Sequence, residues 1–189
     1  MSDRRDTNCT EGMDERCGIM ALKRGDEIKP KTPKLVQRRF GCRKSTWERL
    51  RTIAQWHNFR HDHAARLSSS EIARLLLDAH VELLNALHKP SREEITACIL
   101  DTIPIEVKCL DDEPKALRSS VYMERRTLDM LENVVSHHRI HHPKEAALSV
   151  SEITGLILDG HAQAILMLKE PTRAKIEGYA GWIRSGQRI

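Results

Sequence analysis

Two nearly identical stretches decide the fold of this chain: L-S-S-S-E-I at Leu67–Ile72 and L-S-V-S-E-I at Leu148–Ile153. They lie 81 residues apart, and the same spacing aligns residues 39–84 with residues 120–165 without a gap. Fourteen of these 46 aligned positions are identical, which indicates an internal duplication rather than one shared short motif. A repeat of this length is a supersecondary unit that the chain uses twice.

Each repeat predicts a short strand followed by two helices. Apolar and polar residues alternate in residues 37–43 and 118–124, as in a strand. One strand and two helices cannot bury their faces alone, so we predict a mainly α fold with a short two-stranded antiparallel ribbon. The predicted apolar helix faces are Trp47, Leu50, Ile53 and Ala54, then Ile72, Leu75, Leu76, Ala79 and Leu83, and in the second repeat Leu128, Leu131, Val134 and Val135, then Ile153, Leu156, Ile157, Gly160 and Ala164.

The starts of these helices carry a recognisable signal. A serine followed three residues later by a glutamate is typical of a capping box. This pattern occurs at Ser45, Ser68 and Ser149 in the repeats, and at Ser91 between them. We therefore expect capping boxes at all four serines, the last of them opening a short helix.

The chain divides into five segments. K-P-K-T-P-K at residues 29–34 ends a polar stretch without periodicity, and apolar residues at helical spacing occur in the tail. We interpret residues 1–33 as a disordered N-terminal arm, 34–88 as the first repeat, 89–117 as a connector with a short helix, 118–168 as the second repeat, and 169–189 as a tail with a short amphipathic helix that packs on the body.

Composition and the absence of known motifs exclude several classes of function. The net charge of +4 permits nucleic-acid binding without requiring it. No stretch approaches the ~20 apolar residues of a membrane span, and five cysteines without a C-x-x-C pair fit reduced thiols. No nucleophile elbow, phosphate loop or zinc-finger spacing occurs. We predict a cytoplasmic protein that is not an enzyme and has no cofactor, metal or membrane partner.

The order of elements, with the L-S-x-S-E-I start of the second helix, resembles the ribbon-helix-helix DNA-binding family. The resemblance covers both repeats, about half of the chain. Two copies in one chain look like the tandem type found among accessory DNA-binding proteins of conjugative relaxosomes and among T-DNA border-binding proteins. This implies a tandem ribbon-helix-helix pseudo-dimer that is monomeric, with self-association on DNA left open. The long loops between the helices and Gly41 in the first strand depart from the family pattern.

A two-stranded ribbon fits the major groove of DNA, where outward side chains reach base edges. The register follows from placing Trp47 and Leu128 on the core faces of their helices. The inward side chains are then Phe40, Cys42, Val121 and Met123. The predicted base-reading residues are Gln37, Arg39 and Gly41 on the first strand and Arg118, Ser120 and Tyr122 on the second. A shift by one residue would exchange the inward and outward sets.

The starts of the second helices predict phosphate binding. Unpaired backbone N–H groups and the helix dipole attract a phosphate at such a position, and the resemblance implies the same anchoring. The predicted phosphate-binding residues are Ser68, Ser69 and Ser70 in the first repeat and Ser149, Val150 and Ser151 in the second. The alternative is that these residues only cap their helices.

Seven of the ten histidines lie near the end of the first helix of each repeat or in the following loop. The pairs His57 with His61 and His138 with His142 have a spacing that could hold zinc or nickel on a helix. We favour the alternative that they are exposed loop histidines near the DNA backbone. His80 and His161 also repeat, and we expect them to pack or to cap a neighbouring element.

The resemblance implies a bacterial, sequence-specific, double-stranded DNA-binding protein, associated with the nucleoid or a plasmid. Its task would be that of an accessory factor in conjugative or T-DNA transfer, with a relaxase or another DNA-processing protein as partner. Because the two strands differ, we expect an asymmetric DNA site. Two alternatives remain: a transcriptional repressor of the same fold, and a helical adaptor that does not bind DNA.

Overall fold

The computed structural model describes residues 34–61, 66–104 and 117–186. The predicted N-terminal arm lies outside these residues, as do residues 105–116 of the predicted connector. Within the described ranges the chain is mainly helical, with one two-stranded antiparallel sheet, as predicted. Its elements are β1 (Leu35–Cys42), α1 (Lys44–Arg60), α2 (Ser69–Asn85), α3 (Arg92–Leu100), β2 (Leu117–Glu124), α4 (Arg125–His141), α5 (Val150–Leu166) and α6 (Arg173–Arg184).

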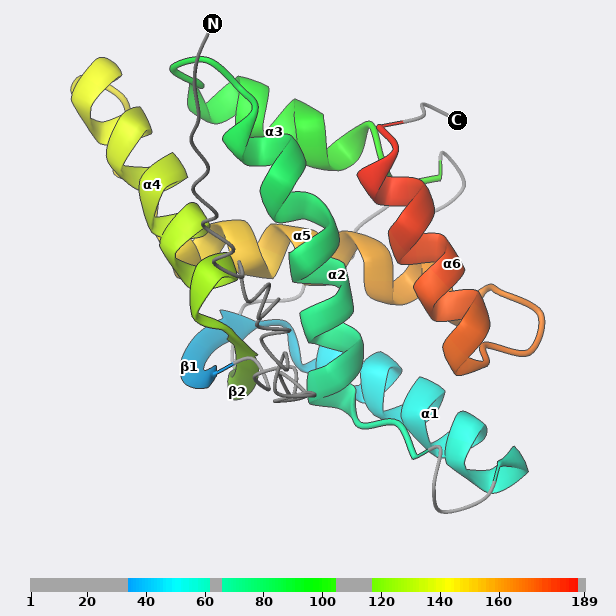
Figure 1. Cartoon of the computed structure of the whole chain (residues 1–189). Coiled ribbons are helices and arrows are strands. Elements are labelled where there is room, and N and C mark those ends of the chain that lie inside the picture. The colour runs from blue at the N-terminus through cyan, green and yellow to red at the C-terminus, as the bar shows by residue number, and fades with distance from the viewer. Residues whose placement is uncertain (1–33, 62–65, 105–116, 187–189) are drawn as a thin grey trace, which may run out of the picture. The chain divides into compact units, whose positions relative to one another are not determined.

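The ribbon forms where apolar side chains alternate with polar ones, because one face of the strands can then be buried. β1 and β2 pair antiparallel, with Gln37 opposite Tyr122 and Arg39 opposite Ser120. The ribbon lies at one edge of the helical body (Figure 1). The predicted inward side chains Phe40, Cys42, Val121 and Met123 are all at most 2% exposed.

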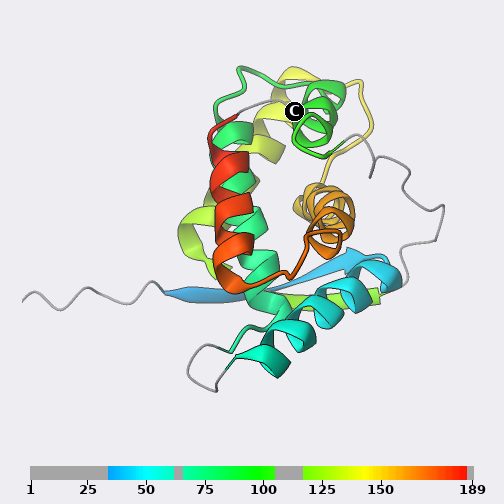
Figure 2. The same cartoon turned by 90° about the vertical axis from the view of Figure 1, so that its right-hand side faces the viewer.

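The helices of each repeat pack largely on the other repeat. α1 packs against α5 and α4 against α2, while α5 covers β1 and α2 covers β2. α6 lies beside α2, and α3 contacts α5 (Figures 1 and 2). The predicted apolar face residues are buried, except that Trp47, Leu75, Leu83, Val135 and Leu156 are half-buried against the core. The core is therefore built jointly by both repeats.

The predicted capping boxes form only in part. Ser91 makes a complete box with Glu94 at the start of α3. Ser68 and Ser149 contribute only the serine half, each accepting a hydrogen bond from the backbone N–H three residues on. The second halves of those two boxes are missing because their glutamates have other partners.

Glu71 and Glu152 each form an ion pair with an arginine at the start of another helix. Arg173 is the first residue of α6, and Arg92 is the first residue of α3. Arg173 Nη1 lies 2.7 Å from Glu71 Oε1, and Arg92 binds Glu152. The two arginines are 81 residues apart, within the pattern P-x-R-x-x-I at residues 90–95 and 171–176. The duplication therefore continues into α3 and α6, and each repeat fixes a helix start of the other.

The predicted capping box at Ser45 is wrong. α1 begins at Lys44, and its N-cap residue, Arg43, makes no side-chain cap. The equivalent N-cap of α4, Glu124, makes none either. In both repeats the strand passes into the helix through a single residue or directly, so the helix has begun before Ser45 is reached.

A chain of hydrogen bonds crosses the core between α2 and α5. His80 Nδ1 donates to the Leu76 carbonyl at 3.0 Å, so Nε2 of the neutral ring is an acceptor. His161 Nε2 lies 3.0 Å from His80 Nε2 and must therefore be the donor. His161 Nδ1 then accepts from the Tyr179 hydroxyl at 2.7 Å. Thr102 Oγ1 lies 3.0 Å from His80 Nε2 and closes the cluster.

Burial keeps both rings of this cluster neutral. Desolvation lowers the pKa of His80 to about 4, against the raising effect of the Leu76 carbonyl. Desolvation, and secondly the nearby His80, lowers the pKa of His161 well below its ordinary value. Each neutral ring carries one N–H. If either ring gained a second proton, two donors would point at each other and a hydrogen bond would be lost. The predicted role of packing is thus confirmed, and a hydrogen-bonding role is added.

Gly178→Ala is expected to stabilise the protein. Gly178 lies within α6, and an added Cβ would meet nothing within 4 Å. Alanine is favoured over glycine inside helices by about 0.5–1 kcal/mol, so the midpoint of urea unfolding should rise. Gly160→Ala in α5 is the control, because its Cβ would overlap Cδ1 of buried Ile103. An equal gain in both variants would contradict this account.

Candidate nucleic-acid interface

The outer face of the ribbon carries polar side chains that are open to solvent. Gln37 and Arg39 are exposed, and Tyr122, opposite Gln37, is 49% exposed. Ser120, opposite Arg39, is half-buried. The ribbon therefore brings four of the six predicted base-reading side chains together on one surface.

The remaining two predicted readers form one backbone pair. Gly41 lies opposite Arg118 in the ribbon. Gly41 is half-buried and lacks a side chain, so it lowers the height of the outer face at that end. The side chain of Arg118 lies outside the described part of the structure.

Two of the serines predicted to bind phosphate also connect the helices to the ribbon. The N–H of Gly41 donates to Ser151 Oγ at 2.9 Å. The N–H of Tyr122 donates to Ser70 Oγ at 3.0 Å. The two donors are 81 residues apart, as are the two acceptors, so each helix start holds the strand of the other repeat.

The other predicted phosphate-binding residues sit at the helix starts. The hydroxyls of Ser68 and Ser149 cap α2 and α5. Ser69 and Val150 are the first residues of those helices, and both are half-buried. N–H groups in the first turn have no acceptor within their own helix, and the helix dipole adds positive charge there. These starts therefore offer backbone N–H groups to an anion, and the serine hydroxyls, which act as acceptors in these bonds, keep their own O–H to donate.

Two grooves lie beside the ribbon at these helix starts. The groove at α5 measures about 630 Å³ and is lined by Arg38, Arg39 and residues 149–151. The groove at α2 measures about 340 Å³ and includes Tyr122 and Arg74. Both grooves therefore join a helix start to side chains from the outer part of the ribbon.

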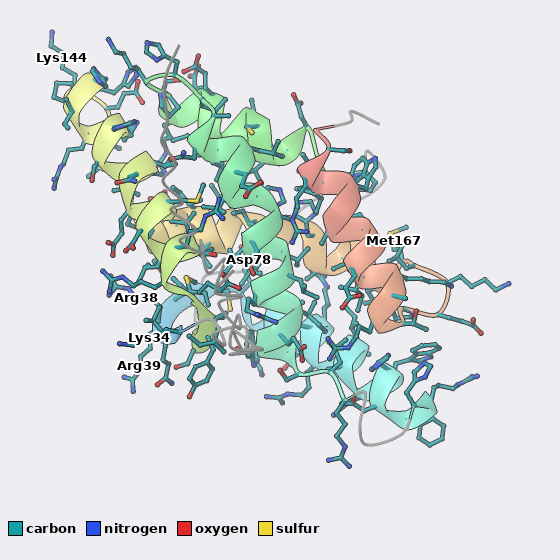
Figure 3. The ribbon with its side chains drawn as sticks, in the orientation of Figure 1. Lys34, Arg38, Arg39, Asp78, Lys144 and Met167 are labelled. Atoms are coloured by element: carbon teal, nitrogen blue, oxygen red, sulfur yellow. The ribbon has the colours of Figure 1, made fainter. Side chains whose placement is uncertain are left out.

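Basic side chains gather around the ribbon. Figure 3 shows Lys34, Arg38 and Arg39 together at this end of the body, away from the helical core. Arg38 is half-exposed and lies 4.0 Å from Glu132 on α4. The sequence analysis did not single out Lys34 or Arg38. The signal for Lys34 was present, because it ends the K-P-K-T-P-K stretch that leads directly into β1.

Two threonine–aspartate hydrogen bonds, one buried and one partly buried, hold the helices behind the ribbon. Thr46 at the start of α1 donates to Asp159 on α5 at 2.6 Å. Thr127 at the start of α4 donates to Asp78 on α2 at 2.5 Å. These four residues are identical pairs of the repeat, but sequence spacing alone did not show that they cross between the repeats.

The two aspartate sites differ in the charge of the nearby N-cap residue, which is Arg43 for α1 and Glu124 for α4. Arg43 Nε lies 3.5 Å from Asp159 Oδ2, whose side chain is 3% exposed. At the equivalent place the second repeat has Glu124. Burial, chiefly, and the Glu124 charge raise the pKa of Asp78, against the lowering effects of Thr127 and nearby arginines.

The histidines at the helix ends are not all exposed, so the favoured interpretation is wrong for two of them. His57 and His138 are at most 2% exposed. His57 Nδ1 accepts from the Arg173 N–H at 3.3 Å, and His138 Nδ1 lies 3.4 Å from the Pro90 carbonyl. Both therefore anchor the start of a third helix. Among the described residues, no three His, Cys, Asp or Glu side chains are placed to share a metal ion.

Comparisons with protein-family models, with curated proteins and with solved structures find no match for this chain. Within the described ranges, every helix is too short or too polar to cross a membrane.

Proposed function

We propose that this protein binds double-stranded DNA sequence-specifically through the outer face of its β1–β2 ribbon. The observation that carries the proposal is the row of outward cross-strand pairs, Gln37 with Tyr122 and Arg39 with Ser120. Arginine can bind guanine through two hydrogen bonds, and glutamine can bind adenine in the same way. A two-stranded ribbon is narrow enough to enter the major groove.

The surroundings of the ribbon support contact with the DNA backbone. The two grooves place the starts of α2 and α5 beside the ribbon, one near each strand. Lys34 and Arg38 add positive charge at the same end. Backbone N–H groups and cations of this kind position a protein on DNA without reading its sequence.

We also propose that the two repeats act as a tandem pseudo-dimer within one chain. Reciprocal contacts at a constant spacing support it: Ser70 with Tyr122 and Ser151 with Gly41 hold the ribbon. The ribbon would then present Gln37 and Arg39 from one repeat and Ser120 and Tyr122 from the other. Such a surface favours an asymmetric site, which suits an accessory role at a transfer origin or border sequence.

Arg39→Ala is expected to weaken specific DNA binding by roughly 10- to 100-fold, because a bidentate contact to guanine contributes about 1–3 kcal/mol. The preferred duplex is first selected from a random-sequence library by the intact protein. Fluorescence anisotropy then compares the variants on that duplex and on an unrelated one, at several salt concentrations. Specific binding should weaken steeply as salt rises.

Arg139→Ala is the matched control, since it removes the same charge at an exposed position in the last turn of α4. That end of α4 lies away from the ribbon (Figure 1). If Arg39→Ala and Arg139→Ala bind the selected duplex alike, the ribbon does not read the DNA sequence. Failure to select any sequence would instead favour the helical adaptor. The position of the selected sequence, at a transfer origin or at a promoter, distinguishes the accessory factor from a repressor.

A further inference from the structure

A cavity of about 320 Å³ lies between α2 and α3, and Gly186, which follows α6, also lines it. Its apolar lining includes Leu83 of α2, Leu87 just after α2, and Ala97 and Cys98 of α3. Thr102, which is 6% exposed, also lines the cavity. A volume of this size is at the lower end of that of small-molecule sites, which are mostly apolar with a few polar groups.

The second repeat has aromatic side chains at two of the positions that line this cavity in the first repeat. The residues equivalent to Cys98 and Asp101 are Tyr179 and Trp182 of α6, each 81 positions later. Their rings stack with centroids 5.7 Å apart, and both are packed against the core. In the first repeat a thiol and a carboxylate stand at these two positions, and both line the cavity.

The hydrogen bonds of the buried histidines agree with this comparison. Tyr179 reaches His161 through its hydroxyl, at 2.7 Å. The equivalent residue of the first repeat is Cys98, and His80 Nδ1 donates to the Leu76 carbonyl. The ring that completes the second repeat therefore has no counterpart in the first.

Two carboxylates that line the cavity determine which charge an aromatic ligand should carry. Glu94 and Asp101 both line it, and Glu94 stands where the second repeat has Lys175. Hydrogen bonds from the backbone and side chain of Ser91 lower the pKa of Glu94, so its carboxylate is ionised at neutral pH. An aromatic molecule with a cationic group is thus favoured over one with an anionic group.

We propose that the cavity between α2 and α3 is a binding site for a small aromatic amine, which takes the place of the missing Tyr179 and Trp182 rings. This goes beyond DNA binding, and it does not depend on it. The ring would lie against Leu83 and Leu87, with its ammonium group toward the carboxylates. Thr102 connects the cavity to the histidine cluster between the repeats.

Isothermal titration calorimetry of the full chain with tryptamine tests the proposal. Tryptamine should bind, and indole-3-acetate, which has the same ring and the opposite charge, should bind at least tenfold more weakly. The double variant Cys98→Tyr with Asp101→Trp installs the residues of the second repeat and should weaken tryptamine binding at least tenfold. Met167→Tyr adds a ring at an exposed position outside the cavity and should leave binding unchanged.

A second measurement uses the native chain, in case the double variant does not fold. Tryptamine should slow the alkylation of Cys98 by iodoacetamide at least tenfold, measured on the isolated peptide by mass spectrometry. The proposal is overturned if tryptamine does not bind, if the filled variant binds it as the parent does, or if Cys98 is alkylated at the same rate with and without it. Stronger binding of indole-3-acetate would overturn the preference for an amine.

Discussion

Arg43→Met is expected to lower the free energy of unfolding by about 3–5 kcal/mol, the usual cost of leaving a buried charge without its partner. Asp159, at 3% side-chain exposure, would lose the guanidinium 3.5 Å away. The hydrogen bond from Thr46 would remain but cannot neutralise the carboxylate. Urea unfolding, followed by circular dichroism at neutral pH, measures the loss.

Glu124→Met is the matched control, because Glu124 is the N-cap of α4 as Arg43 is of α1. Removing it relieves the like charge that raises the pKa of Asp78. The variant should therefore be as stable as the parent or slightly more stable. A similar loss in both variants would assign the effect to the helix start rather than to the buried ion pair.

Lowering the pH from 6.5 to 4 is expected to remove about 3 kcal/mol of stability through His80 alone. In the unfolded chain this ring accepts a proton near pH 6.5, whereas in the folded protein burial lowers its pKa to about 4. Between these values the unfolded state binds the extra proton, so acidification favours unfolding. The contribution is fully present above pH 6.5 and is lost progressively as the pH falls toward 4.

His80→Gln isolates this effect from the carboxylates that titrate in the same range. Glutamine does not titrate, so the variant should lose less stability than the parent between pH 6.5 and 4.5 in urea unfolding. His88→Gln, at an exposed position after α2, should follow the parent. If His80→Gln and the parent have the same pH dependence, the buried histidine pair is not the cause.

The helices and the two-stranded ribbon were predictable from the sequence, because the spacing of apolar residues indicates which faces are buried. Alternation at Phe40 and Cys42, and at Val121 and Met123, left one way to bury each strand, and the structure has it. The serines at the helix starts were likewise readable, because a cap is a local interaction. The capping box predicted at Ser45 was wrong, because α1 begins one residue earlier, at Lys44, directly after the strand and its single connecting residue.

Contacts between the repeats were not predictable from spacing within one repeat. Asp78 and Asp159 are identical in the alignment, yet their partners lie on the opposite repeat and differ in charge. The cavity beside Cys98 was missed for the same reason. The equivalence of α3 with α6 lies outside residues 39–84 and 120–165, where the two repeats align most clearly.

The pairing of β1 with β2 inside one covalent chain has a consequence for expression level. When two separate chains make a ribbon, dilution below their dissociation constant separates the strands. Here the tether fixes the local concentration of each strand around the other, whatever the number of molecules in the cell. A gene read only rarely would still produce a complete ribbon from every polypeptide.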